Sequence, residues 1–325
     1  MLTANKINSV LIIGMAGGLA RRLASLLIKT YPSVQITGVD NRDKPRSFQG
    51  KNVTFQKIKY NRSNFERVFR SQSFDIVYHL GRITHADIWT KASDRNDINI
   101  IGTQKILELS LHFAVKKVVL LSTYHVYGAY ADNPLYIPET FPLRATFKHP
   151  ELVDVVEMDQ SATNFMWRHR DDIEIVVFRP CSIIGRRIRN TMYTYLTSNY
   201  TPVPIDFRPM FQFIHENDMT RILLMSLEKM PSGVFNVAPD DTVSIQKAKK
   251  VLGSQTIPTP VSLVQAFSKF VALPSSVPAY LLDYLKFSCI ISNKEIKKYL
   301  GENFLQYTTW KTLESLLRPP KDLDS

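Results

Sequence analysis

Residues 10–28 read VLIIGMAGGLARRLASLLI, and this stretch decides the fold. The run at 10–13 is continuously apolar, as in a strand of a parallel sheet that is buried on both faces. The stretch at 19–28 carries its leucines at helical spacing. Between the two lies a GxxGxxA loop at 14–20, whose glycines allow a tight turn and a close approach of backbone to a pyrophosphate. Because a helix that begins there offers N–H groups to phosphate, the stretch predicts a dinucleotide site.

The alternation of apolar runs and helical patterns continues to about residue 180. Four further runs predict strands, at 34–39, 76–80, 118–121 and 173–178, and three helical patterns lie between them, at 65–69, 99–113 and 152–168. Strands that alternate with helices predict an α/β protein with a Rossmann-type doubly wound parallel sheet.

The regular alternation of strand and helix patterns ends after residue 185, where Pro202, Pro204 and Pro209 predict a loop-rich stretch. We therefore expect a dinucleotide-binding domain at 1–185 and a smaller C-terminal substrate-binding subdomain at 186–325. Within the latter, residues 211–238 read as strand, helix and strand, and are expected to return to the first domain.

Asp40 ends the second predicted strand, at the position where an acid accepts hydrogen bonds from the adenosine ribose and repels a 2′-phosphate. The sequence therefore predicts NAD rather than NADP as the cofactor. Arg42 lies close by in the sequence and favours NADP.

The composition is that of an ordinary globular protein, with 325 residues, 44% hydrophobic and 22% charged. It excludes a disordered, collagen-like or coiled-coil chain. The net charge of +12 has two equally good explanations, an anionic partner and solubility. Since no block of Lys and Arg is present, no nucleic-acid partner is expected.

Two cysteines exclude a disulfide scaffold, and without a CxxC or Cys/His cluster no metal site is expected. The apolar start is cut by glycines and followed at once by Arg21 and Arg22, so a signal peptide is not expected. No run is long enough to span a bilayer. We therefore expect a cytoplasmic protein.

Beyond the glycine loop, the chain resembles the extended short-chain dehydrogenase/reductases, of the nucleotide-sugar epimerase and dehydratase type. The resemblance covers nearly the whole length and rests on six segments in the family's order: HLGR at 79–82, NIIGT at 99–103, STYHVYG at 122–128, RPCSIIG at 179–185, FIHEND at 213–218 and FNV at 235–237.

The resemblance implies that Thr123 takes the place of the catalytic Ser or Thr, and that Asn99 braces the sheet near the site. The expected cofactor-binding residues are Gly14, Ala16, Gly17, Gly18, Leu19, Asp40, Leu80, Gly81, Arg82, Asn99, Ser122 and Pro180.

The family's proton-transfer pair, Tyr-x-x-x-Lys, is missing from residues 150–159. If Asp159 matches the family's downstream acid, Glu151 stands at the Tyr position and Val155 at the Lys position. Tyr307 and Lys311 match the spacing, but they lie outside any βαβ unit, and we interpret that match as chance. The third strand is also followed by Lys59 in place of the family's adenine-binding Asp.

Four residues are therefore candidates for another acid or base. They are Tyr127, His125, Glu151 and Asp154, each of which also has an ordinary structural interpretation. The catalytic set expected from the sequence is Thr123 with Tyr127, His125 or Glu151.

Arg186, Arg187 and Arg189 follow Gly185 at the expected crevice, and arginines suit a diphosphate. The alternative is a solvated basic loop. The apolar stretch at 257–291 fits either a lipidic group or membrane surface, or the core of a small helical subdomain.

Two functions remain open on the sequence alone. One is an NAD-dependent enzyme that acts on a nucleotide-sugar or a related phosphorylated alcohol, lipid-linked in one version, with a degenerate proton-transfer site. The other is a non-catalytic NAD-binding regulatory or scaffold protein. The expected partner is a small anionic substrate, while peripheral membrane contact and a homodimer are left open.

Overall fold

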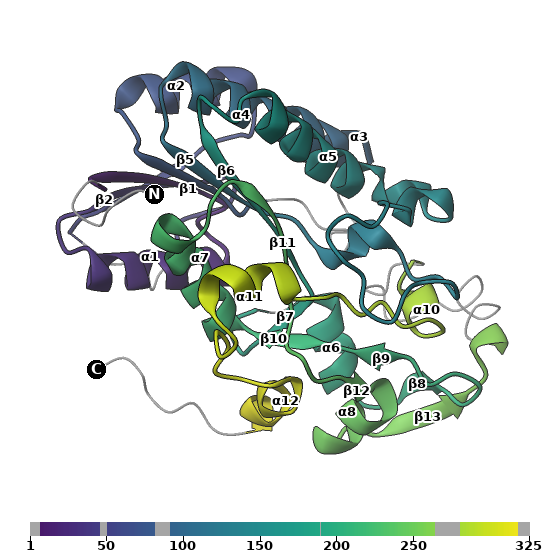
Figure 1. Ribbon diagram of the computed structural model, residues 1–325. Coiled ribbons are helices and arrows are strands. Elements are labelled where there is room, and N and C mark those ends of the chain that lie inside the picture. The colour runs from purple at the N-terminus through teal and green to yellow at the C-terminus, as the bar shows by residue number, and fades with distance from the viewer. Residues whose placement is uncertain (1–6, 46–50, 82–91, 189, 264–279, 318–325) are drawn as a thin grey trace.

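The computed structural model describes residues 7–45, 51–81, 92–188, 190–263 and 280–317 (Figure 1). A seven-stranded, fully parallel sheet forms its centre, in the order β11-β6-β5-β4-β1-β2-β3. The strands are β1 (Ser9–Ile13), β2 (Gln35–Asp40), β3 (Val53–Lys57), β4 (Ile76–His79), β5 (Lys117–Leu121), β6 (Glu174–Pro180) and β11 (Gly233–Val237). The predicted doubly wound parallel sheet is confirmed.

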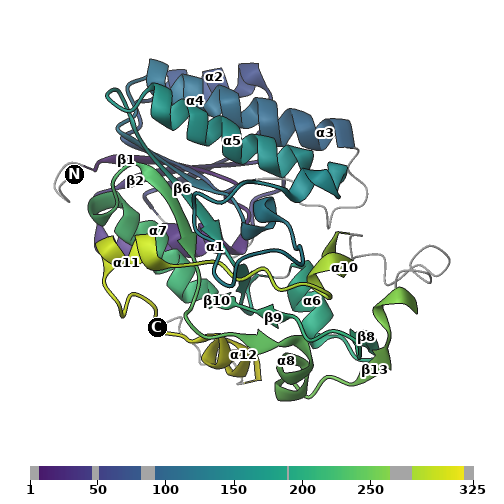
Figure 2. The same ribbon diagram turned by 45° about the vertical axis from the view of Figure 1, so that its right-hand side comes forward.

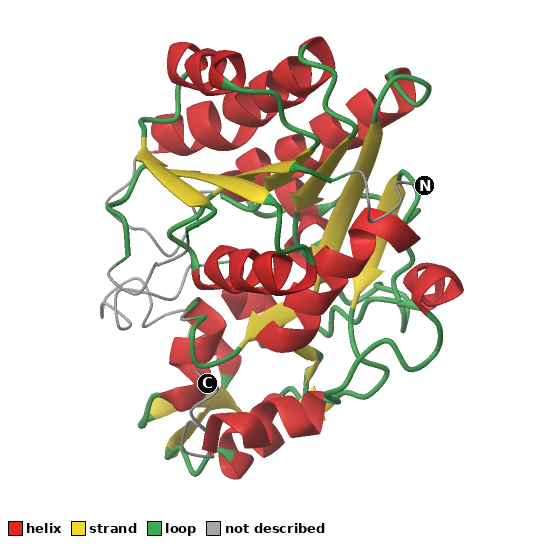
Figure 3. Cartoon of the chain, turned by 90° about the vertical axis from the view of Figure 1, so that its left-hand side faces the viewer, coloured by secondary structure: helices red, strands yellow, loops and turns green. Residues whose placement is uncertain are grey.

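Helices cover both faces of this sheet (Figures 1 and 3). One face carries α1 (Gly18–Thr30) and α7 (Glu216–Lys229), which pack on each other. The other carries α2 (Arg62–Ser71), α4 (Gly102–His112) and α5 (Val153–Arg168), and α4 is preceded by α3 (Ala92–Asn96) and a π-helical turn at Asp97–Ile101.

The two cores explain why the first strand is apolar without a break. Val10 and Ile12 point into the cluster beneath α1 and α7, whereas Leu11 and Ile13 point into the cluster beneath α2, α4 and α5. Edge strand β3 escapes the apolar pattern, because its residues are only half-buried or exposed.

Most of the remaining elements gather beyond the carboxyl ends of β5 and β6 (Figure 2). Three short strand pairs lie there: β7 (Ser182–Ile184) with β10 (Phe213–His215), β8 (Thr201–Pro204) with β13 (Thr256–Thr259), and β9 (Met210–Phe211) with β12 (Val243–Ser244). The helices there are α6 (Thr191–Thr197), α8 (Ile245–Val251), α10 (Leu281–Tyr284) and α12 (Thr309–Leu317), whereas α11 (Lys294–Leu300) packs against β11 and α7.

The segment 211–238 supplies β10, α7 and β11, of which β11 is the sheet strand next to β6. The boundary at residue 185 stays a prediction. In the part of the chain that the structure describes, no helix is both long and apolar enough to cross a bilayer.

Candidate functional site

The strand order reverses between β1 and β4, and the backbone there is packed as closely as glycine allows. Strand β1 pairs with β2 on one side and β4 on the other, so the crossovers on its two sides diverge and leave a crevice at the carboxyl ends. Gly14 has φ +88°, and a Cβ on it would lie 2.4 Å from the Cα of Gly81. The Leu80 N–H donates to the carbonyl of Ile13 at 3.1 Å. Both loops at this switch point therefore need a glycine.

The loop that follows Gly14 is fixed by its own backbone and by the end of β2. Gly17 donates its N–H to the Gly14 carbonyl at 3.0 Å, and both Gly14 and Met15 donate to the carbonyl of Val39. Helix α1 begins at Gly18, and Leu19 in its first turn is buried. The loop thus presents backbone and the positive end of α1 toward the crevice.

Asp40 lies beneath this loop with its carboxylate fully engaged. It accepts from the Ala16 N–H at 2.8 Å, and from the N–H, Nε and Nη2 of Arg42 at 2.9–3.0 Å. Burial by itself would raise the pKa of Asp40, but these hydrogen bonds outweigh burial and hold the pKa below its usual value. The guanidinium of Arg42 therefore stands where a ribose would approach.

Tyr60 is a residue of this end that sequence reasoning missed. Its hydroxyl lies so close to Gly81 that a Cβ there would be 2.9 Å away, and burial raises its pKa above the usual value. Lys59, which stands in place of the family's adenine-binding Asp, has an exposed side chain. An aromatic residue just past the third strand was the signal that could have found Tyr60.

Ser122 and Thr123 follow β5 at the carboxyl edge of the sheet. Thr123 is extended and begins a 3-10 turn at Tyr124–Tyr127, where its Oγ1 accepts from the His125 N–H at 3.4 Å. Ser122 donates its hydroxyl to the buried carboxylate of Asp159. Thr123 is thus held at the edge of the crevice by the backbone around it.

Beneath Thr123 lies a buried polar network that uses up Tyr127. Arg179 donates to Asp159 at 2.6 and 2.9 Å and to the Tyr127 hydroxyl at 2.9 Å, while that hydroxyl donates to Asn236 at 2.8 Å. Burial raises the pKa of Tyr127 to about 12. The Tyr127 hydroxyl is therefore enclosed and already bonded on both sides, and its role as an acid or base stays a prediction.

The start of α5 holds two further predicted residues. Asn99, on the π-helical turn before α4, donates to the Asp154 carboxylate at 2.6 Å, and both side chains are buried. Glu151 lies on the surface at a 3-10 turn, Pro150–Leu152, just before the helix. The Tyr307 ring stacks on His215 at 4.0 Å near the start of α7, away from α5.

Sequence reasoning missed His149, which precedes α5. Its Nε2 lies 2.8 Å from the Asp283 carboxylate, and its Nδ1 lies 3.4 Å from that of Glu151. The ring of Tyr280 stands between His149 and His125, with centroid distances of 6.3 and 5.4 Å. Asp283 and Tyr280 come from the far end of the chain, so no local pattern marks the cluster.

The loop that carries Arg186 and Arg187 lies against the phosphate loop, and the two arginines make different contacts. Arg186 donates to the carbonyls of Ser315 and Leu316 at the end of α12, at 3.3 and 3.2 Å. The Arg187 N–H bonds to Glu216, and its carbonyl lies so close to Gly18 that a Cβ there would be 2.3 Å away. Pro180 ends β6 and is buried. Arg82 and Arg189 lie outside the described residues.

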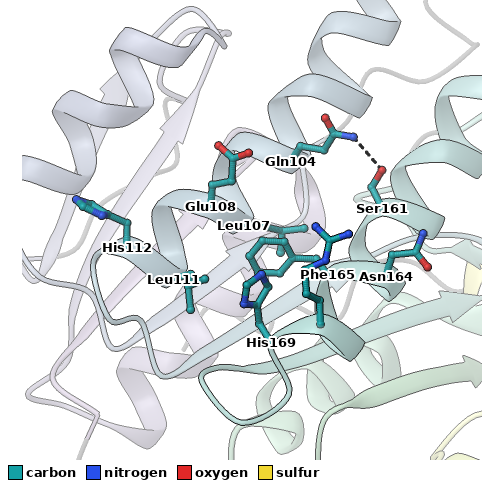
Figure 4. A pocket seen from close by; sticks show the side chains of 10 residues that line it. Gln104, Leu107, Glu108, Leu111, His112, Ser161, Asn164, Phe165 and His169 are labelled. Atoms are coloured by element: carbon teal, nitrogen blue, oxygen red, sulfur yellow. Dashed lines mark hydrogen bonds between the residues drawn. The ribbon is translucent and has the colours of Figure 1, made fainter.

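A hollow of about 710 Å³ lies between α4 and α5 (Figure 4). Gln104 on α4 donates to Ser161 on α5 across it, at 3.1 Å. His112 and His169 mark its other end, where both helices finish. Since helices that follow parallel strands finish at the opposite edge of the sheet, this hollow is remote from the crevice.

Three kinds of similarity were found. The model of the family described as "NAD dependent epimerase/dehydratase family" matches residues 10–238. Relatives in Mycobacterium tuberculosis and M. bovis, named only as uncharacterized proteins, are 24% identical over 195 residues, 60% of this chain and 52% of theirs. The chain thus spans about half the length of these relatives. A UDP-glucuronate 4-epimerase of Thermodesulfobacterium geofontis is 26% identical over 74% of this chain and 79% of its own.

Solved structures share the fold. A UDP-glucose 4-epimerase of Thermotoga maritima, crystallised with UDP-glucose, superposes with a TM-score of 0.72 at 19% identity, over 94% of this chain and 96% of its own. The Bordetella bronchiseptica enzyme WbmG, in complex with NAD, gives a TM-score of 0.73 at 16% identity, over 98% and 95%. At such identities the likeness concerns the fold alone.

Proposed function

The chain belongs to the NAD-dependent epimerase/dehydratase family, and from that premise we propose that it binds NAD at the switch point and oxidises or reduces a hydroxyl-bearing carbon of a nucleotide-sugar. The family resemblance drawn from the motifs and the cofactor NAD are both confirmed at the level of the family. The observation that carries the proposal is the pair of loops at Gly14 and Gly81, which meet at the crevice without room for a side chain.

The residues present fit NAD. Residues 14–19 would hold the pyrophosphate with backbone N–H groups and the start of α1, and Asp40 would accept from the adenosine ribose. Gly81, Ser122 and Pro180 lie at the neighbouring strand ends, where the rest of the cofactor would extend. NAD, when bound, supplies a hydride acceptor; the chain supplies position and proton transfer.

A nucleotide-sugar fits as the substrate class for two reasons. Similar proteins are named for UDP- and dTDP-sugars, and the net charge of +12 favours an anionic ligand. Arg186 caps α12, and Arg187 adjoins the phosphate loop through its carbonyl beside Gly18; a diphosphate contact of either arginine stays a prediction. A lipid-linked substrate, membrane contact, a homodimer and the cytoplasmic location stay predictions.

One observation favours a second function. Residues 150–159 hold neither Tyr nor Lys, and loss of a general acid/base typically costs about 10²–10⁴-fold in rate. A chain that keeps the cofactor cradle and lacks the usual proton-transfer pair would suit a protein that binds NAD without turnover.

Two measurements test these functions. Calorimetry with NAD(H) and NADP(H) is expected to show tighter binding of NAD(H), and Asp40→Ala should narrow the difference. Stopped-flow reduction of bound NAD with UDP-glucose and UDP-galactose is expected to be at least about 10²-fold slower than in a Tyr/Lys enzyme. Equal or tighter NADP binding would contradict the cofactor preference. NAD binding with no reduction by any nucleotide-sugar would favour the non-catalytic function.

A further inference from the structure

His149 lies in the loop that leads into α5. It stands directly before the 3-10 turn Pro150–Leu152, which leads into α5. The turns at Tyr124–Tyr127, Ala145–Phe147 and Pro150–Leu152 pack in series at the carboxyl edge of the sheet. Thr123 caps the first of these turns, so His149 belongs to the same edge as the catalytic hydroxyl that the family resemblance implies.

The two ring nitrogens of His149 have different neighbours. Nε2 lies 2.8 Å from the Asp283 carboxylate, a distance that requires a hydrogen bond. An ionised carboxylate only accepts, so the neutral tautomer that fits this contact has its proton on Nε2 and its lone pair on Nδ1. Nδ1 lies 3.4 Å from Glu151, too far for a strong hydrogen bond. In that tautomer Nδ1 is the nitrogen that can accept a proton, and it lies beside a carboxylate that reaches solvent.

We propose that His149, oriented by Asp283, is the proton acceptor and donor of this enzyme in place of the missing Tyr/Lys pair. The inference rests on the proposed function. In the oxidation, bound NAD would accept the hydride of the carbinol C–H bond, and Nδ1 of His149 would take the hydroxyl proton as the carbonyl forms. Asp283 stabilises the resulting imidazolium, and Glu151 passes the proton to or from water. The reverse transfer restores the alcohol.

Other candidates are less well placed. The half-buried ring of His125 packs against Tyr124, Tyr280 and Tyr284, with centroid distances of 4.3–5.4 Å, and no carboxylate is seen within 4 Å of it among the described residues. Tyr127 is bonded within the core network. His149 alone among the described histidines lies within 4 Å of two carboxylates.

Buried lysines are not alternatives to His149. Lys117 donates to three carbonyls at the end of α7, and Lys249 donates to three at the end of α6. Their ammonium groups close helix ends, away from the start of α5.

The first test needs no activity. Ring-nitrogen NMR of the cofactor-free protein, with His149 assigned through His149→Gln, should show the Nε2–H tautomer of the neutral ring. Asp283→Ala should lose that preference. An Nδ1–H tautomer in the wild-type protein overturns the proposal, whether or not the protein binds NAD.

The second test measures hydride transfer in single turnover with NAD and UDP-sugars. His149→Gln should lower the rate about 10²-fold or more and leave NAD affinity unchanged. The matched control is His169→Gln, since His169 also faces a carboxylate, Asp172 at 3.4 Å, but at the opposite end of α5. The control should keep the wild-type rate.

The outcomes separate the two claims. Reduction that survives His149→Gln overturns this inference and leaves the proposed function standing. A wild-type protein that binds NAD but reduces it with no nucleotide-sugar overturns the catalytic role of His149 together with the enzymatic function. Failure to bind NAD at all counts against the cofactor site first.

Discussion

The crevice has two ends that are built differently. At the switch point, between β1 and β4, the geometry is set by backbone: Gly14 and Gly81 pack against each other, and the phosphate loop bonds to the β2 backbone. At the start of α5, the geometry is set by side chains, above all His149 and Asp283, which lie 134 residues apart. Where close backbone contacts set the geometry, few residue types fit at each position. Where side chains set it, different residues can supply the same chemical group. The cofactor end can therefore keep its family pattern while the proton-transfer end changes.

The largest expected effect is at Gly14. Gly14→Ala combines a left-handed backbone with a Cβ 2.4 Å from the Gly81 Cα, and should cost about 2–5 kcal/mol of unfolding free energy and abolish NAD binding. Denaturant unfolding and calorimetry measure the two effects.

Gly301→Ala is the matched control for this substitution. Its φ is +83°, nearly that of Gly14, but a Cβ there meets nothing within 4 Å. It should cost only about 1–2 kcal/mol. Equal losses at the two positions would mean that the close approach of the loops contributes nothing, and the contrast between the two ends would lose its basis.

How much the sequence predicts follows the same division. The phosphate loop was predictable because strand, glycine turn and helix are adjacent in the chain, and each element has its own local pattern. His149 was not, because a histidine two residues before a predicted acid means little until Asp283 is seen beside it. The surroundings of Tyr127 were hidden from the sequence for a related reason. Its partners Arg179 and Asn236 lie 52 and 109 residues away, and only the fold shows that its hydroxyl is enclosed.

His79 offers a second comparison, since it is the histidine of the cofactor end. It is buried at the end of β4 with Nε2 2.8 Å from the Thr103 hydroxyl, and burial lowers its pKa to about 4 from 6.5. Between these values the unfolded chain binds a proton that the folded chain refuses, so stability is lost as the pH falls from 6.5 to 4. The shift corresponds to about 3 kcal/mol.

Unfolding measurements from pH 7 to pH 4 check this expectation. His79→Asn should lower stability at pH 7 but flatten its decline toward pH 4. His215, whose pKa burial and nearby Arg22 also lower to about 4, keeps its own contribution, so the slope should decrease without vanishing. An unchanged slope in the variant would show that His79 is protonated as readily in the folded chain as in the unfolded one.

The smallest effect sharpens the description of the cofactor end, where one side chain does compete with the ligand. Arg42 donates Nε and Nη2 to the Asp40 carboxylate that would receive the ribose hydroxyls. Its side chain is 62% exposed, so it can swing away at a cost of up to about 1 kcal/mol, typical of an exposed ion pair. Arg42→Ala removes that cost and should tighten NAD binding by about 2–5-fold.

The same change should weaken NADP binding, because a 2′-phosphate would lose its nearest cation and still face Asp40. Lys57→Ala is the control for charge alone. Lys57 pairs with exposed Asp43 at 2.7 Å at the end of β3, and its loss removes one positive charge without freeing Asp40. Calorimetry with both cofactors on the two variants should therefore give a higher NAD to NADP affinity ratio only for Arg42→Ala. If Arg42→Ala weakens both cofactors equally, Arg42 contributes general attraction to phosphate and does not compete for Asp40. The cofactor end would then be set by its backbone alone.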